Sequence, residues 1–170
     1  MRLLNPILDR WRLFALIAAA AMLGIAHAFE TFGAYAPCTL CLRQREAYWV
    51  AGAVAAASLV LVRLPGARLW RPLTLAALAL VFLAGAGIAA YHAGVEWKFW
   101  PGPTTCSSAG GGVSAADMRD LLAGARVRPP ACDQAAWVFA GLSMAGWNAL
   151  AALGLTGLSL AAFRRERARS

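Results

Sequence analysis

The sequence predicts an all-α membrane protein, a four-helix transmembrane bundle with one long external loop that carries a short surface helix. Hydrophobic residues make up 61% of the 170 positions and charged residues only 14%, whereas a soluble domain usually has about a quarter charged residues. The mean hydropathy is +0.59. Four apolar runs, separated by charged segments, are each close to the roughly 20 residues that cross a bilayer. A single transmembrane domain covering 1–170 is therefore expected.

The four spans are expected at about 12–30, 43–62, 72–91 and 137–162. The first and third contain no acidic or basic side chain between their ends apart from His27. The second apolar run is short, so the span must begin among charged residues, with the side chains of Arg43 and Arg45 reaching the lipid headgroups. The stretch "PCTLCLRQR" at 37–45 is thereby placed at the membrane surface, at the mouth of this helix.

Basic residues indicate how the spans are oriented. The net charge is +8, and arginines gather in the N-terminal tail, in the loop 63–72 and in the C-terminal tail 164–169. With four spans these three segments share one side, which the positive-inside rule makes cytoplasmic. A nucleic-acid partner is not expected, because the arginines lie at the ends of apolar runs instead of along one polar face. The alternative is that 1–28 form a cleaved signal peptide, which would leave three spans.

The external loop at about 92–136 is the one sizeable polar portion of the sequence. Ser114 as an N-cap, Asp117 three residues later and Gly124 as a stop predict a short helix in it, with one apolar face suited to the membrane surface. Cys106 is followed by a glycine run and Cys132 is preceded by two prolines. Both cysteines are therefore expected in irregular structure, and an irregular loop of this length is usually functional or disordered.

All four cysteines of the chain (Cys38, Cys41, Cys106 and Cys132) are expected on the external side, where disulfides can form. Three interpretations compete. The cysteines could form two structural disulfides, or they could supply four sulfurs to a zinc ion, although a second C-x-x-C is lacking. The third interpretation is a redox relay.

Physical chemistry favours the relay. A C-x-x-C disulfide closes a very short loop, so it stabilises little as a staple and is readily reduced. A thioredoxin domain is excluded because no βαβ pattern is present. Cys41 lies near the N-terminus of the second span, where the helix dipole and Arg45 one turn later stabilise a thiolate. A reactive thiolate at a lipid surface needs a lipid-soluble redox partner, and a quinone meets that description.

The pattern P-C-x-L-C-x-x-x-R, present as Pro37, Cys38, Leu40, Cys41 and Arg45, adds a family resemblance. Together with four spans and a second external cysteine pair before the last span, it resembles the DsbB family. Members of this family are membrane quinone reductases of the bacterial disulfide-forming pathway. The resemblance implies a location in the bacterial inner membrane, with both termini in the cytoplasm and the cysteines facing the periplasm.

The resemblance also implies an order of electron transfer. A periplasmic thioredoxin-like dithiol protein (DsbA type) would attack a Cys106–Cys132 disulfide at Cys106, and Cys132 would pass the electrons to Cys38. Cys41 would be the thiolate that interacts directly with ubiquinone or menaquinone, and Arg45 would stabilise the negative charge on thiolate and quinone. No metal is expected.

Further polar residues are assigned less directly. His92, at the outer end of the third span, resembles a family position near the quinone and could give a hydrogen bond or a proton to a quinone oxygen; the alternative is an interfacial histidine satisfied by headgroups or water. Arg43 could face the thiols or the headgroups. Interfacial or packing roles are expected for the remaining candidates: His27, Gln44, Glu46, Trp137, Trp147 and Asn148.

Two other functions remain possible at this point. A vitamin-K-epoxide-reductase-like enzyme also couples thiols to quinones in a four-helix bundle, but it carries its quinone-facing C-x-x-C near the end of a late span, and Cys106 and Cys132 form no such motif. A non-enzymatic membrane scaffold with two structural disulfides is the second alternative.

Overall fold

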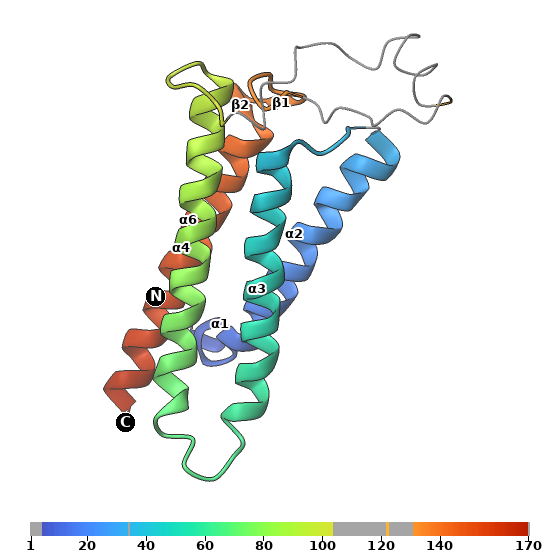
Figure 1. The fold of residues 1–170 in the computed structure, drawn as a ribbon. Coiled ribbons are helices and arrows are strands. Elements are labelled where there is room, and N and C mark those ends of the chain that lie inside the picture. The colour runs from blue at the N-terminus through green and yellow to red at the C-terminus, as the bar shows by residue number, and fades with distance from the viewer. Residues whose placement is uncertain (1–4, 34, 104–121, 123–130, 170) are drawn as a thin grey trace.

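A computed structural model describes residues 5–33, 35–103, 122 and 131–169. The described part is mostly helical and contains a short helix α1 (Asn5–Asp9), four long helices and one small hairpin. The long helices are α2 (Trp11–Gly33), α3 (Thr39–Leu61), α4 (Trp70–Glu96) and α6 (Met144–Arg169), and the hairpin strands are β1 (Val138–Phe139) and β2 (Leu142–Ser143). Helix α4 packs against α3 and α6, and α3 packs against α2 (Figure 1).

Three of the long helices in the described ranges, α2, α4 and α6, are long and apolar enough to cross a membrane. Helix α3 has a comparable length but begins with the charged residues Arg43, Arg45 and Glu46, which lower the hydropathy of its first turns. Figure 1 shows the C-terminal end of α6 and the turn between α3 and α4 toward one end of the molecule. The C-x-x-C segment and the hairpin lie at the opposite end.

The last long helix begins at Met144, so the expected start near 137 is wrong. Val138 pairs with Ser143 and Phe139 with Leu142 in an antiparallel hairpin. The two residues between the strands have positive φ angles, 51° at Ala140 and 80° at Gly141, as a two-residue hairpin turn of type I′ requires. An apolar run alone does not distinguish such a hairpin from the first turns of a helix.

Small side chains set the spacing of the helices. Ala19 of α2 and Ala51 and Ala55 of α3 are fully buried, and a Cβ atom built on Gly85 of α4 would lie only 3.2 Å from the Cβ of Ala47. Such residues let helix backbones approach closely, as is usual for helices packed in a membrane. The alanine-rich composition is thereby explained by the contacts of α3 with both of its neighbours.

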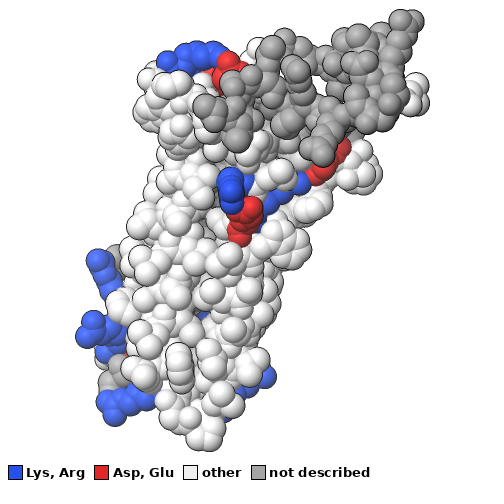
Figure 2. Space-filling view, in the orientation of Figure 1, with Lys and Arg blue, Asp and Glu red and all other residues white. Residues whose placement is uncertain are grey.

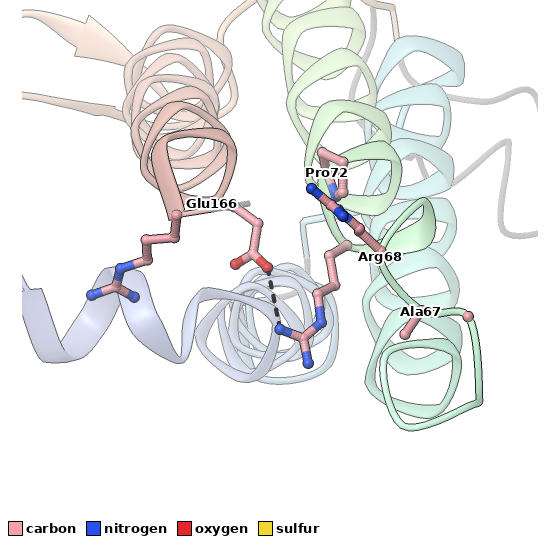
Figure 3. Close-up of a pocket in the computed structure, with 7 residues that line it drawn as sticks. Ala67, Arg68, Pro72 and Glu166 are labelled. Carbon is pink, nitrogen blue, oxygen red and sulfur yellow. Dashed lines mark ion pairs between the residues drawn. The ribbon is translucent and has the colours of Figure 1, made fainter.

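In the view of Figure 2, charged side chains lie along the lower left edge and in the upper half of the molecule, and the broad face between these two groups is largely uncharged. Near the C-terminal end of α6, Asp9 pairs with Arg165 at 3.0 Å and with Arg169 at 2.6 Å. A cavity of about 460 Å³ between the α3–α4 turn and the end of α6 is lined by three arginines among its seven residues, and Glu166 pairs there with Arg71 at 3.8 Å (Figure 3). The residues that line this cavity include no cysteine.

The expected surface helix at 114–124 and Cys106 lie outside the described residues, apart from Leu122 within that segment. Cys132 and the residues that follow it are described, and this segment leads into β1.

Candidate active site

The C-x-x-C motif forms the N-terminal cap of α3. Cys38 has the extended backbone (φ −78°, ψ 171°) of an N-cap residue, and its Sγ accepts a hydrogen bond from the backbone N–H of Cys41 at 3.3 Å. Cys38 thus takes the place that serine, threonine or aspartate usually takes at a helix start. Cys41 lies in the first helical turn, where the positive end of the helix dipole favours a thiolate.

The two thiols are free and are in contact with each other. The thiol of Cys38 donates to Sγ of Cys41 over 3.0 Å. This hydrogen bond, together with burial, raises the pKa of Cys38, so the proton of the pair stays on Cys38. The negative charge of the pair is therefore placed on Cys41. Of the two cysteines, Cys41 is the more exposed.

His92 contacts the motif from α4. Its side chain is buried, its Nε2 lies 3.6 Å from Sγ of Cys38, and its Nδ1 lies 2.7 Å from Nε2 of Gln44. The same amide nitrogen of Gln44 donates to the carbonyl oxygen of Leu40 at 3.3 Å. Since that carbonyl can only accept, the amide NH₂ group faces His92, and Nδ1 is the acceptor. In the neutral ring the proton is then on Nε2, beside Cys38.

Gln44 joins three helices. Its Oε1 accepts a hydrogen bond from Nδ2 of Asn148 in α6 at 2.5 Å, and Oδ1 of Asn148 accepts from the hydroxyl of Tyr48 at 2.5 Å. The expected interfacial role of Gln44 is wrong, because only 6% of this residue is exposed. The interfacial alternative for His92 is also wrong, since its ring is buried and bonded to Gln44. A polar chain therefore leads from Tyr48 to the thiols.

Glu96 lies one helical turn beyond His92. Its side chain is 5% exposed, and its Oε1 is 3.8 Å from Nε2 of His92. Its Oε2 is buried without a hydrogen-bond partner among the described residues. Sequence reasoning missed this residue, although the i, i+4 spacing from His92 places both side chains on one face of α4.

Arg45 ties α3 to α2. Its guanidinium donates to Oε2 of Glu30 at 2.6 Å and to the carbonyl oxygen of Ala26 at 3.2 Å. Arg45 lies at the wall of the same cavity as Cys41, which suits a positive charge beside a thiolate. Its charge is shared with Glu30, so the thiolate-stabilising role predicted from the sequence stays a prediction.

Arg43 points away from the thiols. It pairs with Glu46 at 2.9 Å, and both side chains are exposed, 64% and 60% respectively. Arg43 is not among the residues that line the cavity beside the C-x-x-C motif. Arg43 therefore does not contribute to the wall of that cavity, its contact with lipid headgroups stays a prediction, and the interfacial role expected of Glu46 agrees with its exposure. His27 bonds the carbonyl oxygen of Leu23 within its own helix at 2.8 Å.

A cavity of about 640 Å³ opens beside the two thiols. Its volume is in the range of small-molecule and cofactor sites, about 300–1,000 Å³. Most of its wall is apolar, and Phe29 meets Trp137 edge-on at 5.4 Å between ring centroids. Trp137, Trp147 and Asn148, expected to be packing or interface residues, all line the cavity. Its polar and ionisable lining residues include the following: Cys38, Cys41, Gln44, Arg45, Tyr48, His92, Glu96, Gln134 and Asn148.

Cys132 lies directly against this site. It is fully buried, it is disulfide-bonded, and it belongs to a cluster with Cys38, Leu40 and Val95 against which Cys41 packs. A four-sulfur zinc site would need Cys132 as a free thiolate, so that interpretation does not fit. Ligand atoms of Cys38, Cys41 and His92 lie within 4.8 Å of one another, but tetrahedral zinc with Zn–S bonds of about 2.3 Å keeps two sulfurs about 3.8 Å apart, farther than the observed 3.0 Å.

Helices suited to a membrane, a free dithiol in the wall of an apolar cavity and a disulfide-bonded cysteine against that dithiol define a membrane thiol–disulfide oxidoreductase. The sequence profile of the family described as "Disulfide bond formation protein DsbB" matches residues 9–162, nearly the whole chain. The protein therefore belongs to the DsbB family of membrane oxidases for disulfide bond formation, and the resemblance seen in the sequence is confirmed. No curated protein and no solved structure gives a significant match.

Proposed function

We propose that this protein reoxidises a periplasmic DsbA-type dithiol oxidase and passes the electrons through two cysteine pairs to ubiquinone or menaquinone. In this proposal α3 is the fourth span, both termini are cytoplasmic, and the cysteines face the periplasm at the inner membrane. The arginines of the α3–α4 turn and of the C-terminal end of α6 support this orientation.

The observation that carries the proposal is the apolar cavity beside Cys41. A lipid-soluble oxidant requires an apolar site of small-molecule size, and a two-electron acceptor must reach the thiolate itself. Cys41 and Cys38 both line the 640 Å³ cavity, and the hydrogen bond from Cys38 keeps the charge on Cys41. The sulfur best suited to attack a quinone therefore lies where a quinone fits.

The second cysteine pair in this proposal is Cys106–Cys132. The chain holds four cysteines; Cys38 and Cys41 are free, and Cys132 is disulfide-bonded. The free C-x-x-C pair also argues against two structural disulfides. Cys132 packs beside Cys38, a position suited to exchange between the two pairs.

Electrons and protons balance along this route. A DsbA-type dithiol reduces the Cys106–Cys132 disulfide by attack on Cys106 and leaves oxidised. Cys132 then attacks Cys38 of an oxidised C-x-x-C pair, Cys106 closes the second disulfide again, and the C-x-x-C pair holds two electrons. Cys41 and Cys38 return to a disulfide as the quinone takes these two electrons and two protons to become a quinol.

The test uses the full chain, purified in lipid-containing detergent, with a reduced thioredoxin-fold dithiol protein and ubiquinone-1 as substrates. Loss of quinone absorbance is followed in the wild type and in Cys41→Ser, which should lose at least about 100-fold in rate because the nucleophile is gone. Leu42→Ser is the matched control: it adds the same hydroxyl one residue away, on a side chain that is exposed and outside the cavity, and should keep the rate. Full quinone reduction by Cys41→Ser, or thiol oxidation by the wild type without quinone, contradicts the proposal.

A further inference from the structure

Glu96 is a buried carboxyl group that the electron route does not use. Its side chain is 5% exposed at the last residue of α4, where the negative end of the helix dipole opposes a carboxylate. Burial also disfavours the charged form. No arginine or lysine is paired with it within the described residues, and its Oε1 lies 3.8 Å from Nε2 of His92. The neutral acid, which carries a donor O–H group, is the form that suits these surroundings.

The side chain of Ser143 hydrogen-bonds to the Glu96 carboxyl group, but one of the two carboxyl oxygens, the buried Oε2, is left without a partner among the described residues. An unmade hydrogen bond of a buried polar group costs about 1–3 kcal/mol, so such an atom points to a partner that binds there. Glu96 lines the same cavity as Cys41, and a quinone in that cavity carries two carbonyl oxygens, which are acceptors.

We propose that Glu96 donates a hydrogen bond, and then a proton, to an oxygen of the quinone that Cys41 reduces, which deepens the function proposed above and rests on it. Two electrons leave the thiol pair, and the Cys38–Cys41 disulfide closes. The quinone gains these two electrons, one proton from Glu96 and one proton from water at the membrane surface. The product is a quinol.

His92 contacts both Cys38 and Glu96. Its Nε2 lies 3.6 Å from Sγ of Cys38 and 3.8 Å from Oε1 of Glu96, and Gln44 donates a hydrogen bond to its Nδ1. Because Nε2 carries the ring proton, His92 acts here as a hydrogen-bond donor and does not accept the thiol proton. The proton that Cys38 loses when it attacks Cys41 leaves to water at the membrane surface, and Glu96 takes a proton from water for the next turnover.

The test compares Glu96→Gln with the wild type in the purified full chain, reduced at the C-x-x-C pair and mixed with ubiquinone-1 in a single turnover. The glutamine keeps the shape and can donate hydrogen bonds through its amide NH₂ group, but it cannot release a proton. The rate should fall by about 100-fold while the Kd for ubiquinone-1 changes by less than about threefold. Infrared difference spectra between the oxidised and reduced protein should show the carbonyl stretch of a protonated carboxylic acid, and this band should vanish in Glu96→Gln.

Two further variants separate a proton donor from a structural group. Glu96→Asp keeps the carboxylic acid and should recover part of the rate. Glu46→Gln makes the same change at an exposed carboxylate outside the cavity and should keep both the rate and the infrared band. A normal rate in Glu96→Gln, or a loss explained by weaker ubiquinone-1 binding alone, overturns the role of Glu96 and leaves the proposed function standing. Failure of the wild type to reduce ubiquinone-1 overturns the proposed function, and this inference with it.

Discussion

Replacing Gln44 by alanine removes the one amide group that joins α3 to both α4 and α6. Three hydrogen bonds are lost with it: to Nδ1 of His92, to the carbonyl oxygen of Leu40 and from Nδ2 of Asn148. The Leu40 carbonyl belongs to the same helix, so the two interhelical bonds dominate the effect. Their partners, His92 and Asn148, are then left without the group that fixes their orientation.

The size of the effect follows from these two bonds. A buried group left without its partner costs about 1–3 kcal/mol in soluble proteins, whereas hydrogen bonds between membrane helices average about 0.6 kcal/mol in double-mutant cycles. Gln44 is buried but borders the cavity, so water can reach part of the gap. We therefore expect a loss of about 1–4 kcal/mol in the free energy of unfolding.

Reversible unfolding of the purified protein in mixed detergent micelles measures this change. Asn148→Ala and the double variant Gln44→Ala/Asn148→Ala complete a double-mutant cycle. A coupling free energy of at least about 0.5 kcal/mol is expected, because the side-chain amides of Gln44 and Asn148 are hydrogen-bonded to each other. Glu46→Ala on the same helix is the control; its exposed pair with Arg43 is worth about 0–1 kcal/mol. A Gln44→Ala loss no larger than that of the control, or strict additivity with Asn148→Ala, would refute the polar chain.

Two more predictions concern the ends of the site. In Arg45→Lys the single ammonium group cannot replace the guanidinium group, whose two NH₂ groups bond Glu30 and the Ala26 carbonyl oxygen. The free energy of unfolding should therefore fall by about 1 kcal/mol. An unchanged value in the same micelle assay would show that this bridge does not hold α2 to α3. Near Cys132, the hydrogen bond from Lys98 lowers the pKa of Asp133 from 3.8. A lowered folded pKa gives stabilisation that is complete above the unfolded pKa and is lost as the pH falls through the folded one. Hydrogen-exchange protection around Asp133, relative to Lys98→Ala, should therefore be present at neutral pH and disappear below about pH 3.8; equal protection of both proteins at pH 7 would contradict it.

Local signals in the sequence were sufficient to locate three of the four long helices and the C-x-x-C pair. Apolar runs bounded by arginines predicted the positions of α2, α3 and α4, because helix formation in lipid depends on length and hydropathy. The start of α6 was misplaced because the turn at Ala140–Gly141 interrupts a run that is apolar throughout. The C-x-x-C spacing identified Cys38 and Cys41, since the thiol chemistry and the helix start are both properties of neighbouring residues.

By itself the sequence determined the class of the protein, the C-x-x-C cysteine pair and the positive charge that follows it, because each depends on composition or on residues close together in the chain. Only the tertiary structure decided which polar residues surround the thiols. Gln44, His92 and Asn148 come from three different helices, and the rotation of each helix about its axis determines whether such a side chain meets lipid or its partners. The same packing turned Arg43 outward, placed Arg45 against Glu30, and buried Glu96 beside the cavity, none of which neighbouring residues could specify.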